Sequence, residues 1–196
     1  MAFRLLVVLV ILSYIVHRAY YVRKVRHGSG TVAHQPPEPG LRFLLLLLAV
    51  ALAGTTAYVA RPEWMRWASM PLPGWLRWAG LVPAAAGFAL LQWSQVALGR
   101  NWSGQVQLLK DHELVVSGPY RWVRHPMYAA GLLTHVSLPL LSANWFVGGI
   151  WLLLHGSNFA ARIPLEERLM TSQFGDAYKR YMQTTGRLIP RVLHRG

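Results

Sequence analysis

Three long apolar runs constrain the fold of this chain more than any other feature of its sequence. They cover residues 3–22, 41–60 and 75–98. A helix of about 20 residues rises 1.5 Å per residue and therefore crosses a hydrocarbon layer of about 30 Å. Each run predicts a membrane-spanning helix. We expect the first run to remain in the protein, because no small-residue cleavage site follows it.

A fourth apolar stretch, residues 127–161, contains no charged side chain. We expect a reversal between Pro139 and Asn144, which divides the stretch into arms over 127–142 and 144–161. Such a helical hairpin returns its two ends to the same side of the membrane. The predicted fold class is all-α: a polytopic membrane helical bundle in one domain (1–196). It has five transmembrane segments, the last two a helical hairpin, and a cytoplasmic C-terminal helical tail.

The net charge of +13 is explained by membrane topology rather than by nucleic acid. Of the 20 Lys and Arg residues, 16 lie in the connectors and tail of one predicted face, and four lie on the other. Positive residues accumulate on the cytoplasmic side of membrane proteins. We therefore expect an integral protein of a bacterial inner membrane with its N-terminus outside and its C-terminus inside. Its predicted surroundings are membrane lipids, with no nucleic acid partner.

The chain has no cysteine, which excludes a disulfide scaffold, thiol catalysis and cysteine-ligated metals. His135 and His155 lie on the two hairpin arms without the spacing of a metal site. We therefore predict no bound metal and expect both histidines to make interhelical hydrogen bonds.

The segment that leads into the hairpin carries an unusual group of polar and aromatic residues. Pro126 suits the first turn of a helix, which places His125 at the helix N-terminal edge, where free N–H groups favour an anionic ligand. An interfacial anchor of Tyr, Trp and Arg explains the same composition and remains an alternative.

The segment that leaves the hairpin carries a second polar group. Pro164 is expected to begin a new helix, with Glu166 and Glu167 in its opening turns. Arg162 lies four residues before Glu166, so a local ion pair at a helix cap is the simpler alternative. Because the two segments flank one hairpin, we expect them to lie close together and to enclose a binding site.

These residues resemble the isoprenylcysteine carboxyl methyltransferases and their prokaryotic relatives. The resemblance covers about residues 98–190 in the same order and spacing. Its motifs are Gly118-Pro119-Tyr120, Arg124-His125-Pro126-Met127-Tyr128, Arg162-Ile163-x-x-Glu166-Glu167, Phe174-Gly175-x-x-Tyr178-x-x-Tyr181 and Arg187-Leu188-Ile189-Pro190.

The resemblance implies an integral membrane enzyme that uses S-adenosyl-L-methionine, with a cofactor region at about 99–128 and 158–190. The residues that it implies for the cofactor are Gln107, His112, Glu113, Leu114, Val115, Tyr120, His125, Pro126, Met127, Tyr128 and Glu166. Arg162 is expected to bind the substrate, and Arg162 and Glu167 are the candidate catalytic residues. Gln105 is an alternative to Gln107.

The implied reaction is carboxyl O-methylation of an isoprenylcysteine-type, lipophilic acceptor that enters from the bilayer. A carboxylate is already ionised at neutral pH and needs no general base, and Arg162 can orient it. Two alternatives stay open. A phosphatidylethanolamine N-methyltransferase needs a base, for which Glu167 or His125 is a candidate. A non-catalytic membrane scaffold or sensor predicts no turnover.

Overall fold

A computed structural model describes residues 1–26, 40–99 and 113–191 of the chain. Its longer helices are α1 (Ala2–Arg26), α2 (Leu41–Ala60), α4 (Leu81–Leu98), α5 (Pro126–Ser142) and α6 (Trp145–Phe174). Shorter elements are the 3-10 helix η1 (Pro62–Ala68), α3 (Gly74–Ala79), the 3-10 turn η3 (Gly118–Arg121) and α7 (Asp176–Thr184). The described residues form no β-strand, so the predicted all-α class is confirmed for them.

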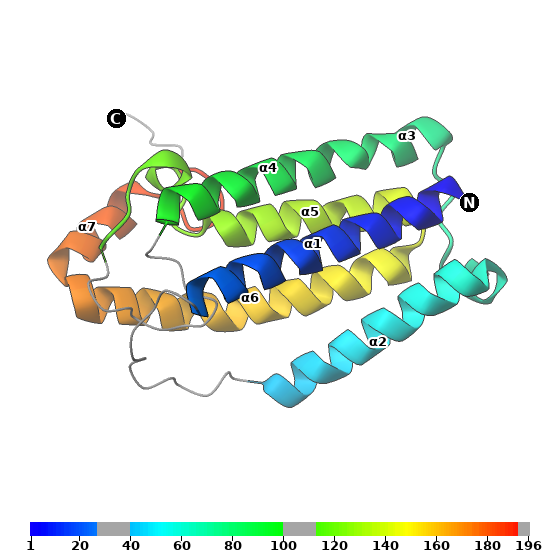
Figure 1. The fold of residues 1–196 in the computed structure, drawn as a ribbon, viewed down its shortest axis with the longest axis horizontal. Helices are drawn as coiled ribbons and strands as arrows, with labels where there is room; N and C mark the ends of the chain where they lie inside the picture. The colour runs from blue at the N-terminus through cyan, green and yellow to red at the C-terminus, as the bar shows by residue number, and fades with distance from the viewer. Residues whose placement is uncertain (27–39, 100–112, 192–196) are drawn as a thin grey trace.

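The long helices run roughly parallel or antiparallel in one bundle, with α5 packed against α4, α1 and α6 (Figure 1). The α4–α5 contact is very close, because a Cβ atom on Gly87 would lie 2.2 Å from Thr134 Oγ1. Helix α2 packs on α6 through Leu47, Ala51 and Gly54, whereas its first residues are exposed. The core thus surrounds α5, and α5 carries the predicted His125–Tyr128 group at its start.

The predicted helical hairpin is formed by α5 and α6. It reverses at Ala143, which adopts a left-handed conformation with φ 49°, and at Asn144. The Asn144 side chain caps α6 by accepting a hydrogen bond from the Val147 N–H at 2.9 Å. Helix α5 continues through Pro139, so the turn is shorter than the sequence suggested.

One prediction made from a proline was wrong. Pro164 does not begin a helix but lies inside α6, which continues to Phe174. A proline removes one backbone hydrogen bond from a helix, and the packing of α6 against its neighbours outweighs that loss. In the third apolar run the break falls at Gly80, between α3 and α4, and Pro83 lies in the first turn of α4.

Length and composition mark three candidate membrane spans among the described residues: Ala2–Lys24, Leu41–Ala60 and Gly74–Leu98.

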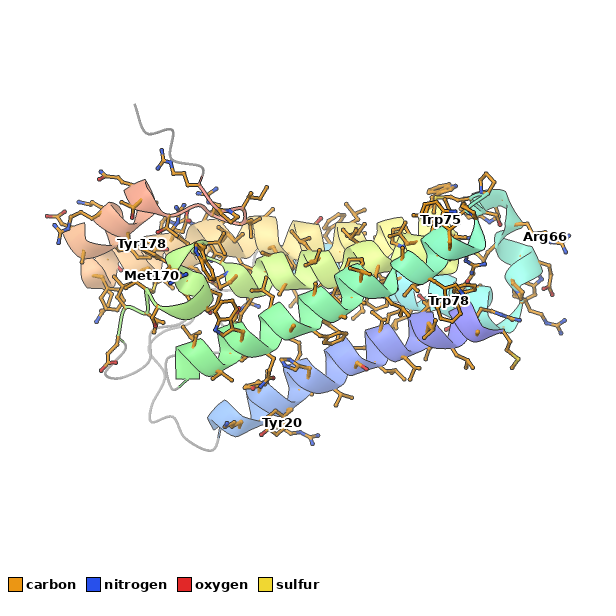
Figure 2. All side chains as sticks on the ribbon, turned by 90° about the horizontal axis from the view of Figure 1, so that it is seen from above. Tyr20, Arg66, Trp75, Trp78, Met170 and Tyr178 are labelled. Carbon is orange, nitrogen blue, oxygen red and sulfur yellow. The ribbon has the colours of Figure 1, made fainter. Side chains whose placement is uncertain are left out.

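Aromatic and basic residues gather at one end of the bundle, where Figure 2 shows Trp75, Trp78 and Arg66. Met170 and Tyr178 lie at the opposite end, where the α5–α6 hairpin opens. Trp residues at such a position are typical of a membrane–water boundary.

Candidate functional site

The chain enters α5 through the turn η3, which buries Tyr120 at 7% exposure. Pro126 is the first residue of α5 and His125 precedes it as the N-cap, as the sequence predicted. His125 is also 7% exposed, so its imidazole is directed into the protein. The local sequence therefore fixes a buried aromatic group and a buried imidazole at the end of the bundle where the hairpin opens.

Glu167 connects this entry segment to α6. Its Oε1 atom accepts hydrogen bonds from Arg124 Nε at 3.1 Å, from Arg124 Nη2 at 3.0 Å and from His125 Nε2 at 3.2 Å. Its Oε2 atom accepts a hydrogen bond from Arg187 Nη2 at 2.6 Å. Its hydrogen-bond donors lie before α5 and after α7, so Glu167 connects the two ends of the hairpin.

Glu166 faces a different set of groups. Tyr128 Oη donates a hydrogen bond to Glu166 Oε1, and His125 Nδ1 lies 3.6 Å from Glu166 Oε2. Arg162 Nε lies 4.0 Å from Glu166 Oε1. The Glu166 side chain is 27% exposed, compared with 7% for Glu167. Of the two adjacent carboxylates, Glu166 is the one that a ligand can reach.

The segment after α7 packs across the start of α5, and we call residues 185–188 the strap. Arg124 N–H donates to Gly186 O at 2.8 Å, and His125 N–H donates to Arg187 O at 3.0 Å. Leu188 packs against the cluster of Tyr128, Phe159 and Ile163. The C-terminal tail thus closes one side of the site.

The electrostatics of the site follow from these contacts. Burial disfavours ionisation of Glu167, but hydrogen bonds from His125, Arg187 and Arg124 lower its pKa to about 2. Burial opposes the charged form of His125 as well, yet its hydrogen bonds to Glu166 and Glu167 raise its pKa. Burial raises the pKa of Tyr120. Glu167 is therefore ionised at neutral pH and is already bound by cationic partners.

The structure brings together most of the predicted site residues. Tyr120 lies in η3, and His125, Pro126, Met127 and Tyr128 lie at the start of α5. Arg162, Glu166 and Glu167 face them from α6. Glu113, Leu114 and Val115 precede η3 in a segment without helix or strand, whereas Gln107, its alternative Gln105 and His112 lie outside the described residues.

Two arginines received no role from the sequence, and one expectation about histidines was wrong. Arg124 and Arg187 lie in the quoted motifs, and the structure shows that both bind Glu167. His135 and His155 make no interhelical hydrogen bond to any residue that the structure describes, contrary to the prediction. Each Nδ1 instead bonds to a backbone carbonyl of its own helix, at 2.6 and 3.0 Å, and the two rings stack at 3.7 Å.

Comparison with known proteins identifies this arrangement. The family model of the isoprenylcysteine carboxyl methyltransferase (ICMT) family matches residues 79–172, which contain α4, η3, α5 and most of α6. The match covers just under half of the chain. The apolar helices and this likeness support an integral membrane protein.

Similar ICMT-family proteins include named enzymes. The chain is 32% identical over 113 residues to a protein-S-isoprenylcysteine O-methyltransferase of Tribolium castaneum, covering 57% of this chain and 40% of that one. It is 34% identical over 83 residues to the enzyme of that name from Schizosaccharomyces pombe, covering 42% and 35% of the two chains. The alignments therefore span less than half of either relative.

A solved structure shows the same fold. The eukaryotic intramembrane Ras methyltransferase ICMT superimposes with a TM-score of 0.57 and 26% identity, covering 79% of this chain and 53% of the other. The likeness thus extends beyond the segment that the family model matches, into the helices before α4.

Proposed function

We propose that this protein transfers a methyl group from S-adenosyl-L-methionine to the carboxylate of a lipophilic, isoprenylcysteine-type acceptor. The observation that carries the proposal is the meeting of Glu166, Tyr128, His125 and Arg162 where the two ends of the hairpin come together. The match to the ICMT family model and the names of the relatives support the reaction class.

The described residues fit the methyl donor. Glu166 is a partly exposed carboxylate suited to a methionyl ammonium, and Tyr120 and Tyr128 provide aromatic surface beside it. The donor supplies an electrophilic methyl group: the acceptor oxygen forms the new bond to carbon as the sulfur–carbon bond breaks, and its electron pair stays on sulfur. The residues then need only align the reactants and exclude water. We include Gln107, His112, Glu113, Leu114, Val115, Pro126 and Met127 in the proposed donor site.

Arg162 is the proposed acceptor residue. The Arg162 side chain is 11% exposed. It lies one helical turn before Glu166 in α6, nearer to the turn of the hairpin. A guanidinium in this position can bind a carboxylate by a charge-assisted hydrogen bond. An apolar tail would then extend from Arg162 into the bilayer, while the polar donor arrives from the cytoplasm.

Glu167 serves in this proposal as a positioning residue that holds Arg124, His125 and Arg187, although the sequence made it a candidate catalytic group. A carboxylate whose pKa is about 2 is a poor general base near neutral pH. This favours an acceptor that needs no deprotonation, so we prefer carboxylate O-methylation to phosphatidylethanolamine N-methylation. The names of the relatives favour either reaction over a non-catalytic scaffold or sensor.

We further propose five transmembrane segments, with α5 and the first half of α6 as the last two. The hairpin opens at the end of the bundle opposite the Trp-rich end. By the distribution of Lys and Arg this end faces the cytoplasm, in a bacterial inner membrane. Lipophilic substrate and membrane lipids are the proposed partners.

The test is methyl transfer from labelled S-adenosyl-L-methionine to S-farnesylcysteine derivatives, fatty acids and phosphatidylethanolamine. The proposal expects a base-labile label on a carboxylate acceptor, because methyl esters hydrolyse in base. A base-stable label on phosphatidylethanolamine, or no transfer at all, would refute it. Arg162→Ala should raise KM for the acceptor at least tenfold, whereas Arg168→Ala, an exposed arginine on the same helix, should not.

A further inference from the structure

Gln95 is a buried polar side chain that the proposed function leaves without a role. It lies near the end of α4 and is 2% exposed. Neither its Nε2 nor its Oε1 atom has a hydrogen-bond partner among the residues that the structure describes. Buried amide groups are rarely left unbonded, so this side chain indicates a ligand or a bound water.

Helical geometry fixes the direction in which Gln95 faces. Successive residues turn by about 100° around an α-helix, so Gln95 projects between the directions of Leu91 and Gln92. Leu91 packs into a cluster with residues of α1 and α5. Gln92 bonds to two side chains of α1. Gln95 therefore faces the seam between α1 and the first turns of α5.

The same seam lies beside the proposed donor site. Leu91 lies one turn before Gln95 on nearly the same face of α4, and it shares a cluster with Ala130 of α5 against which Met127 packs. Gln95 is thus placed beside the start of α5, the element that begins next to His125 and carries Tyr128. The turn η3 meets α4 on its opposite face, where a Cβ atom on Gly118 would lie 3.2 Å from Ala97 Cβ.

His17 of α1 adds another unsatisfied atom at this level. Its Nε2 lies 3.2 Å from Gln92 Oε1, which also accepts a hydrogen bond from Tyr21 Oη at 3.2 Å. A carboxamide oxygen only accepts, so Nε2 carries the proton and Nδ1 is an acceptor. His17 Nδ1 is buried without a partner in the described part of the chain. The seam therefore presents two acceptors, on Gln95 and His17, and the donor amide of Gln95.

We infer that Gln95 and His17 bind the nucleoside of the methyl donor, with the Gln95 carboxamide paired to the donor–acceptor edge of the purine. The inference rests on the proposed function. Of the groups that the reaction brings together, the methionyl ammonium and the carboxylates are charged, and the acceptor tail is apolar. The nucleoside is neutral and offers both donors and acceptors, as these unbonded atoms require. A glutamine side chain makes this two-point contact with adenine in protein–DNA complexes.

The test compares two probes on the full-length protein in detergent by calorimetry. The probes are S-adenosyl-L-homocysteine and its analogue in which hydrogen replaces the purine 6-amino group. The wild type should bind the adenosyl compound at least tenfold more tightly than the analogue. Gln95→Met keeps the side-chain length without its hydrogen bonds and should bind both probes equally. The matched control is Ser94→Ala, because the Ser94 hydroxyl bonds within its own helix to Leu90 O at 2.7 Å.

Two outcomes would overturn the inference. If Gln95→Met retains the tenfold preference for the adenosyl compound, the Gln95 amide binds a water instead of the nucleoside. If Gln95→Met lowers the affinity for both probes by the same factor, Gln95 has a structural role. His17→Phe, on a different helix, provides a second variant if Gln95→Met does not fold, and it should also reduce the preference. Retention of the full preference by that variant counts against the inference. A wild type that binds neither probe would instead contradict the proposed function itself.

Discussion

Arg124 donates two hydrogen bonds to a single oxygen of Glu167, at 3.1 Å from Nε and 3.0 Å from Nη2. The two side chains are 8% and 7% exposed, and 43 residues separate them in the sequence. The pair therefore connects the segment that enters the α5–α6 hairpin with the segment that leaves it. The geometry of the candidate site depends on this connection, because His125 and Glu166 are the immediate neighbours of the pair.

Glu167→Gln should strongly destabilise the protein. The substitution keeps the shape of the side chain but leaves the Arg124 charge buried without its counter-ion, which costs about 3 kcal/mol. Thermal unfolding in detergent measures the effect. Glu63→Gln is the matched control, because the Arg61–Glu63 pair is solvent-exposed, with a separation of 3.8 Å. That change should alter stability by less than about 0.5 kcal/mol. Equal effects of the two substitutions would contradict the central role of Glu167.

Acid should weaken the same connection. The pKa of Glu167 in the folded protein is about 2, below its ordinary value of 4.5. The ionised carboxylate therefore stabilises the fold fully above pH 4.5, and this contribution is lost as the pH falls from 4.5 towards 2. Unfolding curves recorded across this range should show a steeper loss of stability in the wild type than in Glu167→Gln. Parallel curves would show that other carboxylates cause the acid sensitivity.

The strap should protect the backbone at the start of α5. The Arg124 and His125 N–H groups donate to carbonyls of the strap, and Leu188 anchors the strap in an apolar cluster. Leu188→Asp should release it and speed hydrogen exchange of these two amides at least tenfold, as measured by mass spectrometry. Ile189→Asp is the control, because Ile189 is 79% exposed. Unchanged exchange in Leu188→Asp would mean that the strap does not shield the site.

Much of the fold could be predicted because single residues or short patterns determine it. The apolar runs gave the long helices, and Pro126 correctly marked the first residue of α5. The proximity of His125 to Glu166 followed from the hairpin, since its two ends must return to one side. The prediction that Pro164 begins a helix was wrong. A proline inside a helix and a proline at its start look alike in sequence, and tertiary packing decides between them. The binding of Arg187 to Glu167 depends on how the tail folds back, for which no local signal exists.

Tyr128→Phe should weaken binding of the methyl donor. The Tyr128 hydroxyl donates a hydrogen bond to Glu166, and its loss would free the carboxylate to turn away from the proposed ammonium position. A hydrogen bond to a charged group contributes about 1.5 kcal/mol, so Kd for S-adenosyl-L-homocysteine should rise about tenfold. Tyr20→Phe provides the control, since Tyr20 is 58% exposed on α1. An unchanged Kd in Tyr128→Phe would argue that Glu166 is not the ammonium ligand.

The close approach of α4 and α5 at Gly87 makes a final prediction about the scaffold of the site. A Cβ atom on Gly87 would lie 2.2 Å from Thr134 Oγ1 and 2.9 Å from the backbone oxygen of Ala130, so Gly87→Ala must push the helices apart. Overpacking of this kind costs about 2 kcal/mol. Gly149→Ala, on α6, has no atom within 4 Å of the new methyl group, and alanine favours the helix more than glycine does. The thermal unfolding temperature should therefore be lower for Gly87→Ala than for the wild type, and unchanged or higher for Gly149→Ala.

Because the same α4–α5 contact holds Gln95 against the start of α5, Gly87→Ala should also weaken binding of S-adenosyl-L-homocysteine. A variant with lower stability but unchanged Kd would separate the packing of the two helices from the binding site.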